Sequence, residues 1–254
     1  MSEMQDQQTP TQQASQVTIR PMTWADVDQV VEEFNNTWSS KDSGEAQISL
    51  LNARHFVLRY LTETTNARVA ELDGKFMGVA LMRVQGQPLL FSQAQAELDM
   101  VDRRLSDSVL GRKNLRRITI WHGLEDGVEA QSKEADASQA ELKLFVVSQA
   151  ARGRGVGGKL WRDMLSQLDS KGVQRFFLHT DSACDVSYYD HIGMERVAAR
   201  IAADQAESIQ DGNFYDDIFI YAAPLSQQLQ RWGMGANQQE SASGESTESG
   251  GDKQ

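Results

Sequence analysis

Hydrophobic residues recur at helical spacing close to the start of the chain. The apolar positions, three or four residues apart, are Trp24, Val27, Val30, Val31 and Phe34. Thr23 stands just before them and Asp26 follows three residues later, which is the arrangement of a capping box. This pattern predicts a helix over residues 23–38, preceded by a short strand at 17–22 and followed by a second helical region at 46–63.

Two β-rich runs come next, at residues 67–72 and 75–84, with only Asp73 and Gly74 between them. Asp-Gly between such runs is a strong hairpin signal, so the two runs are expected to pair as antiparallel strands.

The block at residues 86–139 is expected to be an insertion or an elaborated loop. Its residues 92–113 are mostly helical in composition, "RITIWH" (117–122) predicts a strand, and 124–139 read as a polar, acidic loop. Loops of that length often carry function.

A strand, a helix and a second strand follow one another from residue 141 onward. The strands are "ELKLFVV" (141–147) and "VQRFFLHT" (173–180), and the helix between them covers 158–172. Its buried stripe, at a spacing of four, comprises Leu160, Met164 and Leu168. Gly172 is a suitable helix end.

The last structured elements are a short helix around 185–192 and an antiparallel pair of strands at 194–202 and 213–225. Mostly antiparallel strands with one central βαβ unit define the α+β class. Residues 1–16 and 235–254 are polar and low in complexity, so they are expected to be disordered tails around one domain.

Composition narrows the functional classes. The chain has 254 residues, 40% of them hydrophobic, and a net charge of 25 − 36 = −11, which argues against a nucleic-acid partner. Cys184 is the only cysteine, which excludes an internal disulfide and suits a reducing compartment. No secretory signal and no transmembrane run is evident, so the expectation is a cytoplasmic protein without a membrane partner.

The stretch "ARGRGVGGKLW" (151–161) matches three phosphate-binding patterns at once. Gly153, Gly158 and Lys159 fit most of a P-loop, but that chemistry needs Ser or Thr after the lysine, where this chain has Leu160.

A dinucleotide site is the second pattern, carried by Gly153, Gly155 and Gly158, with Asp181 placed 23 residues later as the ribose ligand. Two features count against it. Five residues, 148–152, separate the strand from the first glycine, and the segments after Asp181 predict a hairpin instead of further βαβ units.

A coenzyme A cradle is the third pattern, Arg152-x-x-Gly155-x-Gly157. Arg152 and Arg154 supply positive charge, the glycines let backbone N–H groups approach a pyrophosphate, and the helix N-terminus favours anions. The alternative is a glycine-rich turn that only caps a surface helix.

These segments, in this order, resemble the GNAT superfamily of acyl-CoA-dependent N-acyltransferases. The resemblance covers most of residues 17–223 except 86–139. It rests on "VTIRPMTWADVDQVVEEF", "ARVAELDGKFMGVALMRV", "ELKLFVVSQAARGRGVGGKLW" and "YYDHIGMERV". Two positions depart from the family pattern: Met194 replaces the usual Phe, and Asp185 stands where many relatives carry Asn.

The resemblance implies a GNAT-like α+β fold, in which a mixed, mostly antiparallel sheet with a central βαβ unit is flanked by helices, over a domain at 17–234. It implies acetyl-CoA as co-substrate and an amine of a small molecule or peptide as acceptor. Block 86–139 would then shape the acceptor site or form a homodimer contact. The net negative charge suits a cationic amine.

The resemblance also implies roles for single residues. Glu141, eleven residues before Arg152, matches the general base, and Tyr189 matches the acid that protonates the coenzyme A sulfur. Val146 and Val147 would pair with the pantetheine arm. The implied pyrophosphate loop comprises Arg152, Gly153, Arg154, Gly155, Val156, Gly157, Gly158 and Lys159.

Each of these residues also has a purely structural interpretation. Glu141 then faces solvent at a strand edge, Tyr189 packs in the core, and Lys159 is solvated. His179 either contacts substrate or is a packed, satisfied side chain. No His, Cys or Asp spacing indicates a metal site. The alternative functions are a non-catalytic acyl-CoA-binding module and an NAD(P)-binding protein.

Overall fold

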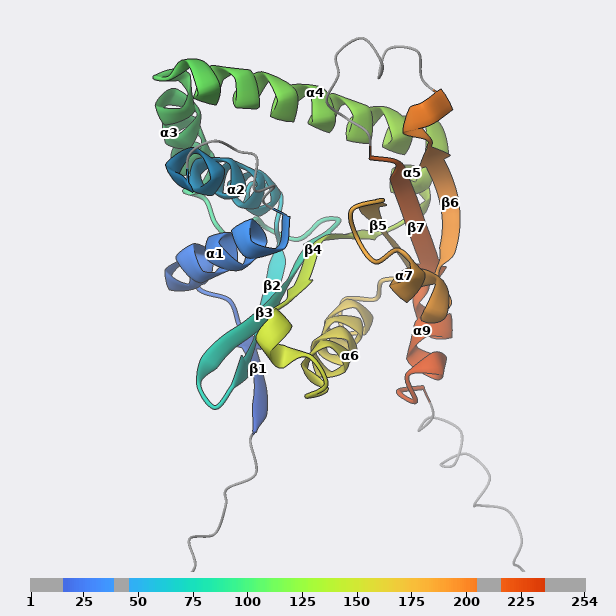
Figure 1. Cartoon of the computed structure of the whole chain (residues 1–254). Coiled ribbons are helices and arrows are strands. Elements are labelled where there is room, and N and C mark those ends of the chain that lie inside the picture. Colours follow the sequence, from blue (N-terminus) through green and yellow to red (C-terminus); the bar gives the residue numbers. More distant parts are fainter. Residues whose placement is uncertain (1–15, 39–45, 205–215, 236–254) are drawn as a thin grey trace, which may run out of the picture. The chain divides into compact units, whose positions relative to one another are not determined.

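The computed structural model describes residues 16–38, 46–204 and 216–235 (Figure 1). The tails expected at 1–16 and 235–254 lie outside these ranges apart from their innermost residues. The chain forms two compact units. The first comprises Met1–Met82, Pro88–Gly111 and Leu144–Asp163, and the second comprises Arg83–Gln87, Arg112–Lys143 and Met164–Gln254.

The strands are hydrogen-bonded in the order β1-β2-β3-β4-β5-β7-β6. Most pairs are antiparallel, and β4 with β5 is a parallel pair, which confirms the predicted α+β class. The strand bounds are β1 Val17–Pro21, β2 Asn66–Leu72, β3 Lys75–Val84, β4 Ala140–Val147, β5 Arg175–Asp181, β6 Glu195–Arg200 and β7 Ile218–Pro224.

The hairpin of the first unit forms where the sequence predicts it. Strands β2 and β3 pair in antiparallel register, and Asp73 and Gly74 between them have φ angles of 53° and 75°. Only glycine and a few short polar residues adopt this left-handed region without strain, which explains the Asp-Gly turn.

A short 3₁₀ turn, Trp24–Asp26, leads into α1 (Val27–Trp38), and α2 (Ala46–Leu61) follows. The N–H of Thr23 donates to Oδ2 of Asp26 at 2.7 Å, which confirms the predicted capping box. The buried face of α1 comprises Val27, Val30, Val31 and Phe34, as the spacing predicts.

The expectations for residues 117–122 and 124–139 were wrong. In place of a strand and an acidic loop, these residues form α4 (Val109–Ser132) and α5 (Glu134–Ala137), after α3 (Ala94–Ser106). The β-branched run "RITIWH" favours a strand locally, but tertiary packing overrides that propensity. Positions three, four and seven apart are buried along α4: Asn114, Ile118, Trp121 and Val128.

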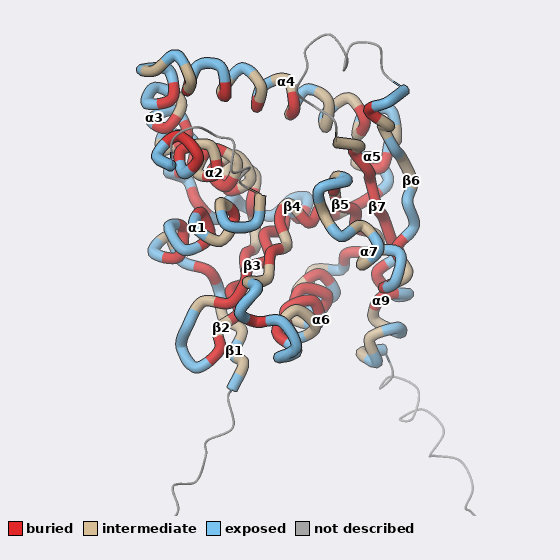
Figure 2. Tube along the Cα trace, in the orientation of Figure 1, coloured by how far each residue is buried: buried red, intermediate tan, exposed pale blue. Residues whose placement is uncertain are grey.

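The second unit is built around β7, whose apolar residues are buried along most of its length (Figure 2). Figure 1 shows β5, β7 and β6 side by side, and both neighbours of β7 are antiparallel to it. The short helix α7 (Ser187–His191) lies between β5 and β6 in the sequence, and α9 (Leu225–Arg231) follows β7. Residues 213–215 of the last predicted strand lie outside the described part of the chain.

Within the described residues, none of the helices is both long enough and apolar enough to cross a bilayer.

Candidate active site

The glycine loop of the first unit connects β4 to α6 (Val156–Asp169) through the 3₁₀ turn Gln149–Ala151. Gly153 and Gly155 have φ angles of 72° and 71°, and a Cβ added at either would meet no atom within 4 Å. Glycine is therefore required there by backbone conformation and not by lack of space. The loop delivers the chain directly to the N-terminus of α6, where backbone N–H groups and the helix dipole favour an anion.

Side chains around this helix start divide into exposed cations and buried apolar groups. Arg152, Arg154 and Lys159 are exposed, whereas Val156 and Leu160 are completely buried. A P-loop needs a magnesium-binding hydroxyl at this position, and the buried Leu160 cannot supply one. Val156 therefore offers only its backbone to a ligand of this loop.

The end of β4 lies against β3 in the same unit. A Cβ on Gly78 would come within 2.6 Å of the Val146 carbonyl oxygen and 3.2 Å of the Val147 Cα. The parallel pairing of β4 with β5 covers Ala140–Leu142, so Val146 and Val147 lie beyond it. A Cβ on Gly157 would in turn lie 3.6 Å from Cγ2 of Val147, which connects the strand end to the loop.

In the second unit, Glu141 lies on β4 with only 5% of the residue exposed. Nζ of Lys143 donates to Oε1 of Glu141 at 2.8 Å. Glu141 is in register with Phe177 of β5, and side chains two positions apart on a strand share a face. Glu141 and Lys143 of β4 therefore share a face with Phe177 and His179 of β5. The solvent-facing interpretation of Glu141 is wrong, because the side chain is buried.

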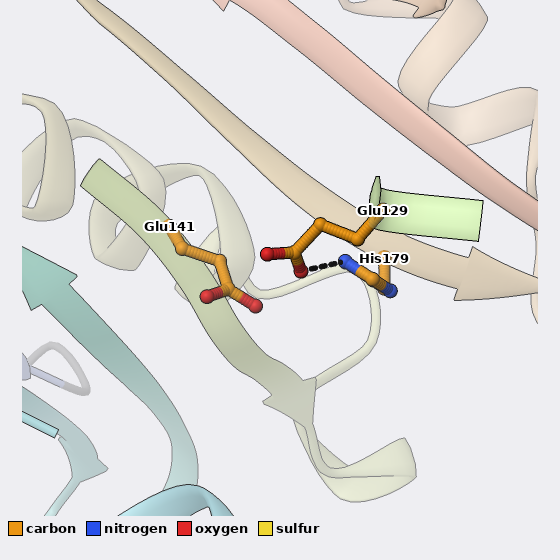
Figure 3. Close-up of side chains that lie close together, drawn as sticks. All are labelled: Glu129, Glu141 and His179. Atoms are coloured by element: carbon orange, nitrogen blue, oxygen red, sulfur yellow. Dashed lines mark hydrogen bonds and ion pairs between the residues drawn. The ribbon is translucent and has the colours of Figure 1, made fainter. Parts of the chain in front are cut away.

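His179 is hydrogen-bonded to a residue of α4. Its Nε2 lies 2.8 Å from Oε2 of Glu129, and the carboxyl of Glu141 lies beside this pair (Figure 3). Burial by itself lowers the pKa of His179, but the bond to Glu129 and the nearby carboxylates of Glu141 and Glu125 raise it above its usual value. The same bond to His179 lowers the pKa of Glu129.

One ligand-capable atom from each of Glu129, Glu141 and His179 lies within 4.8 Å of the others, a separation that one metal ion could span. Both carboxylates already have partners in the protein, since Lys143 binds Glu141 and His179 binds Glu129. We therefore describe these residues as a hydrogen-bonded network and assign no ion to it.

Tyr189 belongs to α7 and packs against aromatic neighbours of the second unit. Its ring centroid lies 5.5 Å from that of Tyr221 on β7 and 5.5 Å from that of Tyr188. Burial raises the pKa of Tyr189 above its ordinary value, and nearby Cys184 adds to this effect. The phenol thus keeps its proton throughout the neutral range.

Asp181 does not lead into a dinucleotide-binding topology. Its Oδ1 accepts the N–H of Ala183 at 2.9 Å, and the described strands that follow, β6 and β7, form an antiparallel pair. Further βαβ units, which a Rossmann domain needs, do not occur after Asp181 in the described residues.

The structure brings Glu141 together with His179 in the second unit, and it brings Val147 and Gly157 together in the first. Sequence reasoning missed Glu129 and Lys143. Lys143 could have been found, because two charged residues at i and i+2 of one strand share a face. Glu129 carried no such signal, since it lies 50 positions from His179 and inside a segment expected to be a loop.

The comparisons with known proteins concern the family to which the chain belongs. Residues 27–194 match the model of the acetyltransferase (GNAT) family. A search of curated proteins found no match. Among solved structures, the chain is similar to a mosquito arylalkylamine N-acetyltransferase like 5b, with 14% identity, a TM-score of 0.49, and coverage of 82% of this chain and 100% of that one.

Another similar structure is the ribosomal-protein-S18-alanine N-acetyltransferase from Escherichia coli, with 14% identity, a TM-score of 0.45, and coverage of 83% of this chain and 94% of that one. The family assignment rests on the family model, whose matched segment contains β4, the glycine loop and α7. The chain belongs to the acetyltransferase (GNAT) family.

Proposed function

We propose that the protein transfers an acetyl group from acetyl-CoA to a primary amine of a small molecule or protein. The observation that carries this proposal is the family match over residues 27–194, which includes Glu141, the glycine loop and Tyr189. The amine attacks the thioester carbonyl directly, and coenzyme A leaves as a thiol.

The glycine loop is proposed to hold the pyrophosphate of acetyl-CoA. Its exposed Arg152 and Arg154 offer guanidinium donors, Gly153 and Gly155 take the backbone conformation that the loop needs, and α6 begins immediately after them. Charge-assisted hydrogen bonds of this kind contribute about 1.5–3 kcal/mol each. The remaining loop donors are proposed to be the backbone N–H groups of Val156, Gly157 and Gly158 and the ammonium of Lys159.

Val146 and Val147 are proposed to pair with the pantetheine arm through their backbone, in the manner of an added strand. Their place beyond the stretch of β4 that is paired with β5 supports this role. The N–H of Val147 is also proposed to stabilise the oxyanion that develops on the thioester carbonyl.

Glu141 is proposed to act as general base through a water molecule. A lysine-like amine has a pKa near 10.4, so presenting it neutral at pH 7 costs about 4.6 kcal/mol without a base. The carboxyl of Glu141 is buried and is held by the hydrogen bond from Lys143. These contacts support its role as a positioned base instead of a mobile surface group.

Tyr189 is proposed to donate its phenolic proton to the sulfur of the leaving coenzyme A. Burial keeps that proton in place at neutral pH, as an acid requires. The neighbouring ring of Tyr221 restricts where the phenol points.

A thermal-shift panel with acetyl-CoA, longer acyl-CoAs, ATP and NAD(P)H tests the ligand. Acetyl-CoA should raise Tm, because a ligand that binds only the folded state stabilises it by mass action. A thiol-release assay over a panel of amines then tests the reaction. A shift without thiol release would favour a non-catalytic binding module, and a shift with NAD(P)H alone would overturn the proposal.

A further inference from the structure

Glu129 and His179 form a hydrogen-bonded pair beside the proposed base, and the acyl-transfer step described above does not use them. The pair is 2.8 Å apart, and both partners are largely buried, with side-chain exposures of 25% and 15%. Glu129 comes from α4, Glu141 from β4 and His179 from β5 (Figure 3), so the tertiary fold assembles the three groups.

The charges around the Glu129–His179 pair come from three elements. The carboxylates that act on His179 belong to Glu125 and Glu129 of α4 and to Glu141 of β4. Lys143 of β4 and Arg83 of β3 act in turn on Glu129. Counted with a neutral imidazole, three carboxylates and two cations give 2 − 3 = −1. Protonation of His179 brings this sum to zero.

Asp181 is the remaining acidic group on the same face of β5. Burial raises the pKa of its carboxyl, and its Oδ1 already accepts the Ala183 N–H at 2.9 Å. Of the titratable groups on this face of β5, His179 is the one whose ordinary pKa lies nearest neutrality.

We propose that Glu129 and His179 gate the entry of a cationic acceptor amine to Glu141. The acceptor binds as an alkylammonium when His179 is neutral, and this attraction is lost when His179 is protonated. This inference rests on the proposed function, in which the ammonium N–H bond breaks, the proton passes through water to the Glu141 carboxylate, and the nitrogen electron pair attacks the thioester. His179 and Glu129 are positioning residues, because they act through the charge presented at Glu141.

The gate predicts the direction of the pH dependence. The pKa of His179 is raised by Glu129 against the opposing effect of burial. Activity toward a cationic amine should therefore fall on the acid side at a pH above the ordinary histidine value of about 6.5. Removal of the Glu129 carboxylate takes away the hydrogen bond that raises the pKa of His179, while burial still lowers it, so the acid-side midpoint should move to lower pH.

The decisive variant is Glu129→Gln, assayed for acceptor kcat/KM across the acid limb. The midpoint should fall to lower pH, and the high-pH plateau should also fall, because one negative charge is lost. The KM for acetyl-CoA should not change. Glu125→Gln is the matched control: it removes the same charge but not the bond to His179, so its midpoint should move less.

Two further measurements separate the gate from a structural effect. An arylamine acceptor, which is neutral at the same pH, should show no dependence on the charge of His179. The ring signals of His179, followed by NMR in the wild-type protein, should titrate above the ordinary value and shift downward in Glu129→Gln. If that variant does not fold, the wild-type titration still decides, because a midpoint at or below the ordinary value overturns the gate.

The outcomes distinguish this inference from the function on which it rests. If the protein transfers acetyl groups but Glu129→Gln does not move the acid limb of the pH profile, the gate is overturned. The acetyltransferase proposal then stays intact. Absence of thiol release with every amine and acyl-CoA overturns both.

Discussion

Lys143 donates a hydrogen bond to Glu141 from two positions further along the same strand, with Nζ 2.8 Å from Oε1. Residues at i and i+2 of β4 share a face, so the ammonium and the carboxyl meet without help from another element. A carboxylate as buried as this one, 5% exposed, needs a charged partner or hydrogen bonds to offset its lost hydration. Lys143 supplies both to the residue proposed as the base.

Glu141→Gln should lower kcat by about 10²–10⁴ while the fold is retained, because the amide cannot take the acceptor's proton. The pH–rate profile should shift upward, since more of the amine must then lose its proton in solution. Thiol release measured across a pH series checks both effects. Asp126→Asn, at an exposed position of α4, is the control. An unchanged profile in Glu141→Gln would remove this residue from the mechanism.

Tyr189→Phe should lower kcat by about 10²–10⁴ with little change in Tm, because only the phenolic hydroxyl is lost. Tyr188→Phe is the matched control one residue away and should stay close to wild type. Burial raises the pKa of Tyr188 to about 12, so its phenol is also protonated and differs from Tyr189 only in position. Turnover at the wild-type level in Tyr189→Phe would contradict the assigned acid.

Arg152→Ala and Arg154→Ala should each weaken acetyl-CoA binding by about 10- to 100-fold, the equivalent of one lost charge-assisted hydrogen bond. The increase in Tm that acetyl-CoA causes should shrink accordingly, while Tm without ligand stays the same, because both side chains are exposed. Arg103→Ala, at an exposed position of α3, should leave the ligand-induced shift unchanged. Equal shifts in all three variants would place the pyrophosphate elsewhere.

The buried Asp26 of the first unit should make the free energy of unfolding depend on pH in the acid range. Its hydrogen bond with Arg20 lowers the pKa of Asp26 from 3.8 to about 2, despite the opposing effect of burial. A pKa that is depressed in the folded state stabilises the protein above the unfolded-state value, and this contribution is lost as pH falls toward 2. With allowance for the partly exposed arginine, the loss should be about 1–2 kcal/mol.

Urea unfolding between about pH 5 and about pH 2 checks this loss. In Asp26→Asn the corresponding part of the acid dependence should disappear. Asp28→Asn is the comparison, since the Asp28 side chain is 78% exposed and its ion pair with Arg54 should contribute little. The same loss of stability in wild type and Asp26→Asn would rule out the Asp26–Arg20 pair as its source.

Local sequence patterns predicted the elements in which the hydrophobic periodicity and the residues at the ends of the segment indicate the same structure. The face of α1, the Asp73-Gly74 turn and the strand–glycine loop–helix order of β4 and α6 could all be read from residues within a few positions of one another. In α4 two local signals conflict, because a β-branched run is superimposed on a helical spacing of buried positions. The β-branched run misled the prediction, and the spacing of Asn114, Ile118, Trp121 and Val128 indicated the helix.

By itself, therefore, the sequence determined the α+β class, the glycine loop with its two arginines, and the resemblance that names Glu141 and Tyr189. Only the tertiary structure decided that Glu129 meets His179, and that Glu141 of β4 shares its face of the sheet with His179 of β5. The physical reason is that periodicity and capping act over a few residues. A contact across 50 positions depends instead on strand register and helix packing, to which no local pattern points.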